Sequence, residues 1–120
     1  MYGVTGLNLD EIVGSEIQQI CCGRYDVQFR FHSGTVITVQ GNVTLLDSQG
    51  QLGKWNEKDN WSTLLFQQLL NVRVSNYSIP DDRLLQIEFD NGFVLQVHDS
   101  SDQYESFQIT KAGTNAMTVV

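Results

Sequence analysis

The two histidines are the side chains best suited to acid–base or metal chemistry near neutral pH. His98 is followed by Asp99 and Asp102, whereas His32 lies in a distant part of the chain. A metal site needs ligands that converge at helical or paired-strand spacing, and the sequence contains no such cluster. The carboxylates near His98 could hold a cation weakly, but this grouping is more typical of a solvated strand end. We therefore predict no metal site.

Nucleophilic catalysis requires a serine, threonine or cysteine next to an oriented base. Cys21 and Cys22 have no histidine near them in the sequence, and as neighbours on a strand they point to opposite faces and cannot form a disulfide. The sequence has no Gly-x-Ser-x-Gly motif, phosphate loop or dinucleotide fingerprint. Glu88 and Glu105 have the chemistry of an acid–base pair, but both fall where strands expose polar faces. These observations favour a non-catalytic protein without a cofactor.

The most distinctive polar signature is the dipeptide Tyr104-Glu105. Its hydroxyl and carboxylate either bond to the backbone after the second hairpin or face a ligand, and both interpretations remain open. We take Tyr104, Glu105 and His98 as candidate binding residues. We assign no catalytic, cofactor-binding or metal-ligating residue.

The charge balance limits the class of partner. The 120-residue chain carries 14 acidic and 7 basic residues, a formal net charge of −7. The few lysine and arginine residues are spread along the chain and do not form the basic patch that binds nucleic acid. An acidic surface also disfavours binding to an anionic membrane. No apolar run approaches the roughly 20 residues of a membrane span, and the N-terminal segment lacks the basic residues of a signal peptide, which indicates the cytoplasm. A basic protein partner fits this charge, and a homo-oligomer is compatible with it.

A repeated segment organises the chain. Residues 27–39 read VQFRFHSGTVITV and residues 85–97 read LQIEFDNGFVLQV, so that Gly34 matches Gly92. Upstream of each copy, an apolar pair is followed by glycine or asparagine. We predict one domain over residues 1–120, with internal repeats at about 7–40 and 60–98.

Each repeat contains a predicted β-hairpin in which apolar and polar residues alternate. A two-residue loop would place Ile37 on the polar face, whereas a three-residue loop pairs Phe29 with Ile37 and Ile87 with Leu95. Such a loop favours glycine in the left-handed region at its last position. The sequence therefore predicts three-residue loops at 32–34 and 90–92.

A helix is expected before each hairpin. The longer one begins after Asn60, presents Trp61, Leu64, Leu65 and Leu69 at helical spacing, and ends at a left-handed Asn71. A shorter piece runs between Asn8 and Gly14. Strands are expected at 16–22, 72–77, near 43–46, at 104–110 and at 117–120, with a turn at 79–82 and a polar loop at 51–58.

Together these elements predict an α+β fold that is mostly antiparallel β. Two helix–strand–hairpin repeats would form one curved sheet or a partly open barrel with one main helix. The expected core contains Phe29, Phe31, Ile37, Ile87, Phe89 and Leu95 together with Leu65 and Leu69.

The Phe-x-x-Gly hairpins and the segment Tyr104-Glu105-Ser106-Phe107 resemble a family of small uncharacterised bacterial proteins, a domain of unknown function. The resemblance spans about residues 9–120. The family usually has Trp where Phe107 stands and Asp where Ser33 and Asn91 stand, changes that keep the structural roles. The resemblance implies a bacterial cytoplasmic protein with Phe107 in the core, and it implies no established activity.

Two functions remain open. The leading expectation is a non-catalytic interaction protein, immunity-like or accessory, that binds another protein, by analogy with bacterial proteins of similar size and charge. The alternative is a small-molecule-binding or enzymatic domain that uses a cleft between the two repeats.

Overall fold

The computed structural model describes seven stretches of the chain, which hold the 3-10 helix η1, ten strands and a 3-10 turn at 66–69. The stretches are residues 8–22, 26–47, 49–55, 66–81, 83–98, 107–110 and 117–119. Within them, side chains are described except at 22, 51–55, 107, 108, 110 and 117–119. Phe107, a predicted core residue, and Leu65 therefore lie outside the described side chains.

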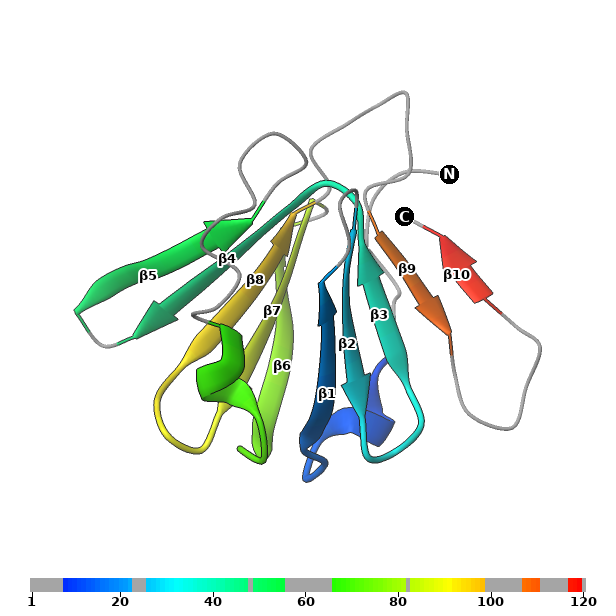
Figure 1. The fold of residues 1–120 in the computed structure, drawn as a ribbon, viewed down its shortest axis with the longest axis horizontal. Helices are drawn as coiled ribbons and strands as arrows, with labels where there is room; N and C mark the ends of the chain where they lie inside the picture. The colour runs from blue at the N-terminus through cyan, green and yellow to red at the C-terminus, as the bar shows by residue number, and fades with distance from the viewer. Residues whose placement is uncertain are drawn as a thin grey trace.

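Ten strands form two five-stranded antiparallel sheets, which face each other in Figure 1. The first sheet has the order β1-β2-β3-β9-β10 and the second the order β5-β4-β8-β7-β6. The elements are η1 (Asp10–Ile12), β1 (Ile17–Cys22), β2 (Val27–Phe31), β3 (Val36–Val39), β4 (Asn42–Asp47), β5 (Gly50–Trp55), β6 (Val74–Asp81), β7 (Leu84–Phe89), β8 (Val94–His98), β9 (Phe107–Thr110) and β10 (Met117–Val119).

The core lies between the sheets because alternate residues of each strand point inward. β2, β3, β7 and β8 all show this alternation of buried and less buried positions. The buried apolar residues of both sheets form a single cluster. Its members are Leu9, Ile12, Ile17, Val27, Phe29, Phe31, Ile37, Val39, Val43, Leu45, Phe66, Leu69, Val74, Leu85, Ile87, Phe89, Leu95, Val97 and Ile109.

The two predicted three-residue hairpin loops are confirmed. Phe29 pairs with Ile37 and Ile87 pairs with Leu95, and all four side chains are buried. Both loops close with a hydrogen bond from the glycine N–H to the carbonyl of the phenylalanine three residues earlier. The glycines have φ values of 94° at Gly34 and 90° at Gly92, in the region that non-glycine residues rarely adopt. The prediction of the loop from strand parity and the loop glycine was therefore correct.

The predicted fold class was wrong. The described chain is nearly all β, without a helix of seven or more residues, and it forms two sheets instead of one curved sheet or a barrel with a main helix. Where the main helix was expected, the described residues 66–69 form a single 3-10 turn, and 60–65 lie outside the described residues. The shorter helical piece is the 3-10 helix η1.

Burial of Phe66 explains this correction. The helical pattern placed Leu64, Leu65 and Leu69 on the apolar face and left Phe66 off it. In the structure Phe66 and Leu69 are both fully buried, and the Phe66 ring meets the Phe29 ring edge to face at a centroid distance of 5.7 Å. Residues three apart lie on the same side of a 3-10 turn, so one short turn buries both side chains.

Two predicted connections are strands. The polar stretch expected as a loop at 51–58 contains most of β5, which pairs with β4 at the edge of the second sheet. The turn expected at 79–82 is largely the end of β6, which is also an edge strand. Pro80 fits there because the register of β6 against β7 shifts between Ser78 and Asp81, and proline is tolerated in edge strands and at bulges.

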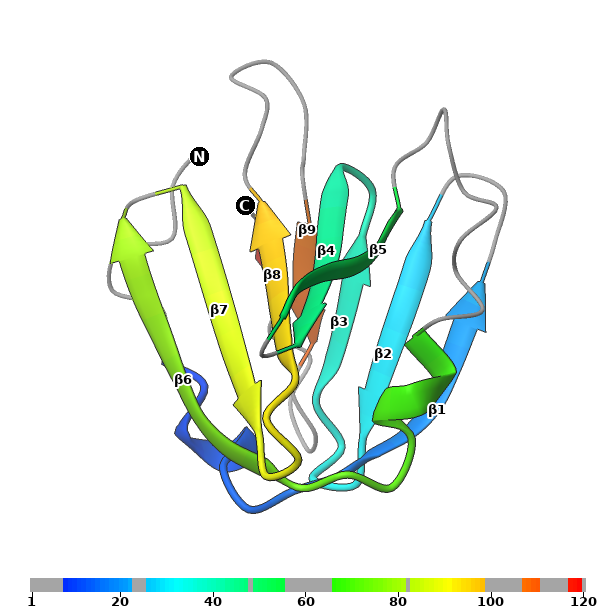
Figure 2. The same ribbon diagram turned by 90° about the vertical axis from the view of Figure 1, so that its left-hand side faces the viewer.

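The chain crosses between the sheets after the first hairpin. β3 belongs to the first sheet, and after Gln40 and Gly41 the chain continues as β4 in the second sheet, as the ribbon at the top of Figure 1 shows. β8 belongs to the second sheet, and β9 pairs with β3 in the first. The first sheet therefore ends in β9 and β10, which follow β8 in the chain. The second sheet ends in β4 and β5, which follow β3. Figure 2 shows β8 and β4 side by side in this arrangement. The division into one domain with two repeats stays a prediction.

Replacement of Gly92 by alanine tests the hairpin geometry. A Cβ atom at Gly92 meets nothing within 4 Å, so only the backbone conformation opposes the change. We expect Gly92→Ala to lower the free energy of unfolding by about 1–2 kcal/mol, measured by urea denaturation. Gly92→Asn, which tolerates the left-handed region, should lose less. Equal stability of Gly92→Ala and the unsubstituted protein would contradict the assigned loop.

Truncation of Phe66 tests the correction of the helix. Because the ring is fully buried against Phe29, we expect Phe66→Ala to lower the free energy of unfolding by about 3–5 kcal/mol. Its exposed neighbour Gln67 is the matched control, and Gln67→Ala should change stability by less than about 0.5 kcal/mol. A small loss at Phe66 would show that the turn does not anchor the core.

Candidate functional site

The outer face of the second sheet carries a row of polar side chains. Ser78, Gln86, Gln96 and Thr44 occupy successive register positions across β6, β7, β8 and β4. Gln96 Nε2 donates to Gln86 Oε1 at 3.0 Å. The inward positions between them are apolar and buried, so the alternation of each strand directs these side chains outward.

His98 and Thr44 form the second polar contact of this face. His98 ends β8, between Leu84 of β7 and Asn42 of β4, and its Nε2 lies 3.1 Å from the hydroxyl oxygen of Thr44. Burial lowers the pKa of His98 below the usual 6.5, and the negative charge of Asp81 only partly opposes this. The imidazole is therefore neutral at pH 7. A hydroxyl next to a neutral histidine, with a carboxylate in the field, has the composition of a nucleophile, a base and an orienting acid.

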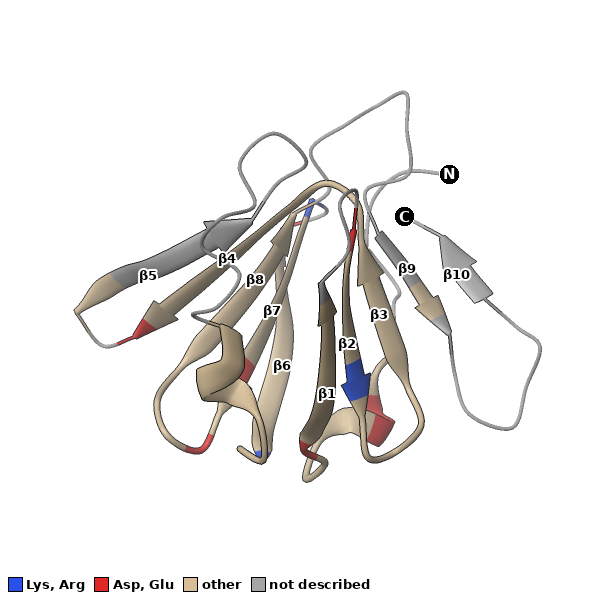
Figure 3. Cartoon of the chain, in the orientation of Figure 1, with Lys and Arg blue, Asp and Glu red and all other residues tan. Residues whose placement is uncertain are grey.

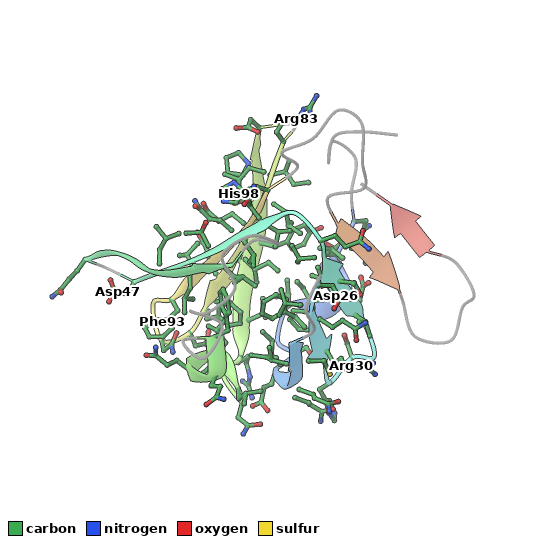
Figure 4. All side chains as sticks on the ribbon, turned by 45° about the horizontal axis from the view of Figure 1, so that its top comes forward. Asp26, Arg30, Asp47, Arg83, Phe93 and His98 are labelled. Atoms are coloured by element: carbon green, nitrogen blue, oxygen red, sulfur yellow. The ribbon has the colours of Figure 1, made fainter. Side chains whose placement is uncertain are left out.

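The surrounding strands limit the chemistry available to Thr44, His98 and Asp81. Thr44 lies inside β4, which pairs with β5 on one side and with β8 on the other. The backbone N–H groups of β4 form hydrogen bonds with these two neighbouring strands. None of them is therefore directed at an oxyanion above Thr44. The Thr44–His98 contact therefore fits a cross-strand hydrogen bond that stabilises the sheet. Figure 4 shows that His98 and Arg83 lie at one end of the molecule, apart from Asp26, Arg30, Asp47 and Phe93.

A second polar cluster forms the turn end, which we define as residues 8–16, 32–34, 71–73 and 90–92. The first residue of each hairpin loop donates its N–H to the segment before the adjacent edge strand, from His32 to Glu16 O and from Asp90 to Arg73 O. Gly14 N–H donates to Val74 O, and Val74 N–H donates to Ser15 O. The two bonds made by Val74 join the two sheets at the lower end of Figure 1.

Side-chain hydrogen bonds connect η1 to β6 on one side and to the residue before β3 on the other. Leu9 N–H donates to the Tyr77 hydroxyl at 3.0 Å, and that hydroxyl donates to Asp10 Oδ1 at 2.9 Å. The bond from Leu9 lowers the pKa of Tyr77, but partial burial and the Asp10 carboxylate outweigh it and raise the pKa. On the other side of η1, the buried Thr35 donates its hydroxyl to Glu11 Oε1 at 3.3 Å. The Asp10 and Glu11 carboxylates are thus held at fixed positions.

Of the three predicted binding residues, the structure describes only His98, so their grouping stays a prediction. His98 is half-buried at the end of β8, and Tyr104 and Glu105 lie outside the described residues. Among the described side chains, no three histidine, cysteine, aspartate or glutamate residues are grouped to hold a metal ion. Cys21 is half-buried and free. In the described part of the chain, no helix is long and apolar enough to cross a membrane.

The sequence contained a signal for one missed contact. The register set by a three-residue loop pairs Ile87 with Leu95, and the same register pairs Gln86 with Gln96. The glutamine pair could therefore have been predicted from the sequence. The partner of His98 was not accessible, because Thr44 comes from a strand more than 50 residues away that pairs with β8 only after the chain crosses between the sheets.

The pH dependence of stability tests the environment of His98. Its pKa is lowered in the folded state, so the unfolded chain binds more protons below pH 6.5. The stability from the neutral imidazole is present above about pH 6.5 and is lost as the pH falls. We expect the unfolding free energy of the unsubstituted protein to fall more than that of His98→Gln between about pH 7 and about pH 5. A His98 titration midpoint at or above 6.5 by NMR would contradict this environment.

Comparison with known proteins places the chain in a family. No curated protein and no solved structure matches it. The model of one family matches residues 8–120, which include all ten strands. The match confirms that the chain contains an uncharacterised domain, as the resemblance implied. The chain belongs to the family of unknown function DUF6188.

Proposed function

We propose that this protein is a non-catalytic interaction module of the bacterial cytoplasm, immunity-like or accessory, which binds a basic protein through its turn end. The observation that carries the proposal is the acidic cluster there, in which hydrogen bonds hold the Asp10 and Glu11 carboxylates. Asp10, Glu11, Glu16 and Asp90 lie in the turn end, whereas Arg73 is the one lysine or arginine within it. Figure 3 shows acidic positions at this lower end of the view.

The rigidity of these groups supports binding over simple solvation. Asp10 accepts from Tyr77, Glu11 accepts from Thr35, and the backbones of Glu16 and Asp90 are bonded at the junction of the sheets. The Asp10 and Glu11 carboxylates, which these side-chain bonds already order, therefore lose little conformational entropy when a partner docks. Val13, 44 % exposed, lies in the same end and offers an apolar contact beside the carboxylates.

The net charge of −7 extends this local preference to long range. At an ionic strength of about 0.01 M, charges act over roughly 30 Å, whereas at about 0.15 M they act over roughly 8 Å. A basic partner is therefore attracted and oriented before contact, and its association rate falls as salt is added.

The alternative is a small-molecule or enzymatic site. The Thr44–His98 contact with Asp81 nearby is the observation in its favour. It lies on the outer face of the second sheet, whereas the space between the sheets holds the apolar core. The engaged backbone N–H groups around Thr44 make this the weaker proposal.

Neutralisation of the turn end tests the proposed interface. The variant Asp10→Asn, Glu11→Gln, Glu16→Gln, Asp90→Asn removes four negative charges and keeps an acceptor oxygen at each position. We expect a protein that the unsubstituted bait retains from the native cell lysate at low salt, and releases as salt rises, to be lost from this variant. Quantitative mass spectrometry of the retained proteins measures the difference.

The matched control neutralises the four other described acidic side chains, through Asp26→Asn, Asp47→Asn, Asp81→Asn and Glu88→Gln. It has the same net charge as the first variant, so a specific interface predicts that it still retains the partner. Equal loss from both variants would mean that only net charge matters. A ligand bound by the unsubstituted protein but not by Thr44→Val would instead support the alternative.

A further inference from the structure

We propose that the outer edge of β1 is a self-association surface, at which two copies of this chain join their first sheets. The two β1 strands run antiparallel in such a dimer, with Ile20 of one copy opposite Ile20 of the other. The proposal is independent of the acidic turn end and of the basic protein proposed to bind there.

The edge at β1 differs from the other three sheet edges. β5 carries Lys54 and shifts register against β4, β6 contains Pro80 and two register shifts, and β10 has only three residues. Charge, proline, irregular register and short length all hinder the addition of another strand. β1 reads IQQICC, without charge or proline, and its register is irregular only at its beginning, between Ile17 and Gln19. β1 is therefore the edge that is least protected against pairing.

The backbone of β1 presents a donor and an acceptor at this edge. Phe31 N–H donates to Thr35 O, on the β3 side of the first hairpin. The direction of the backbone groups alternates along an antiparallel strand, so those of the preceding Arg30 point to β1, where the register partner is Gln19. The N–H and C=O of the next residue in β1, Ile20, therefore point away from β2 and toward the edge.

The described chain leaves this position of β1 without a partner strand. Among the described residues, backbone pairing at this edge is limited to Leu70 and Asn71, which meet β1 at Ile17. Ile20 is half-buried and packs against the core from one side. In β6 the corresponding place is held by Tyr77, whose hydroxyl bonds with η1. A strand added beyond Ile17 would bond the free backbone groups and bury more of the Ile20 side chain.

The side chains of β1 favour a second copy as that strand. Residues directly opposite each other in an antiparallel pair share a face. Pairing centred on Ile20 therefore sets the two isoleucines together on the inner face and Gln19 opposite Cys21 on the outer face. No like charges meet across this pair, although the chain has a net charge of −7. A basic strand would find no acidic side chain in β1, and the symmetric pairing closes as a dimer.

The dependence on salt separates this dimer from the proposed basic partner. Two copies with a net charge of −7 each repel one another at long range, and added salt screens the repulsion. The dimer should therefore become stronger as salt rises, whereas binding of a basic protein becomes weaker. Failure of one proposal leaves the other standing.

Hydrogen exchange of the unsubstituted protein, followed by NMR, tests the edge directly. At about 50 µM, the Ile20 amide should exchange faster than the amides of Gln19 and Cys21, which are directed at β2. At about 1 mM, we expect exchange at Ile20 to slow severalfold. Analytical ultracentrifugation should show a dimer at the high concentration, with a larger dimer fraction at about 0.5 M salt than at about 0.05 M.

A charge at the edge provides the matching variant. Ile20→Lys should abolish the dimer, whereas Ile79→Lys, at a half-buried isoleucine of the edge strand β6, should keep it. Circular dichroism checks that both variants are folded, and the exchange measurement on the unsubstituted protein decides if Ile20→Lys is not. The variant with four neutralised acids at the turn end should still dimerise.

Three results would overturn the proposal. One is exchange at Ile20 that does not depend on protein concentration, and another is a dimer that Ile20→Lys, once shown to be folded, leaves intact. The third is protection of the Ile20 amide that appears only when a captured basic protein is added, because this would assign the edge of β1 to that protein.

Discussion

The pairing of β3 with β9 and of β8 with β4 is the interaction on which the rest of the structure depends. β3 and β8 carry the deeply buried Ile37, Val39, Leu95 and Val97, and each would be an open sheet edge without its crossing partner. An open edge with this much apolar surface cannot remain in water, because it exposes unpaired backbone groups as well as apolar side chains. The crossings therefore oblige both sheets to form together around one core.

The turn end follows from the same arrangement. Once the sheets share a core, their inner edge strands meet at Gly14–Glu16 and at Asn71–Arg73, and backbone hydrogen bonds join them. The short 3-10 turns that precede these edges insert Leu9, Ile12, Phe66 and Leu69 into the open end of the core. Because the turns must face inward with their apolar residues, Asp10 and Glu11 are left on the outside beside the hairpin loops.

Sequence reasoning succeeded where local rules decide the outcome and failed where a distant contact decides it. The hairpin loops were correct because strand parity and a glycine at the last loop position are properties of a few adjacent residues. The main helix was wrong because the burial of Phe66 against Phe29 outweighs a modest helical pattern. The loop expected at 51–58 was wrong over 51–55 for a related reason, since β5 is a strand only through its pairing with β4. Of the candidate residues, His98 was placed correctly at a strand end, but its partner Thr44 was not foreseeable.

The amino-acid sequence by itself determined the two hairpins, their register, the inward set of apolar residues and the acidic balance. These depend on residue type, on the two-residue period of a strand and on the left-handed conformation that glycine permits. Tertiary structure alone decided that the hairpins belong to two sheets, that each sheet is completed by strands from the other part of the chain, and that Asp10, Glu11, Glu16 and Asp90 share one end. The physical reason is that the sequence of a strand does not specify which strand pairs with its edge, because any antiparallel partner offers the same backbone hydrogen bonds. Shape and burial in the assembled core select the partner.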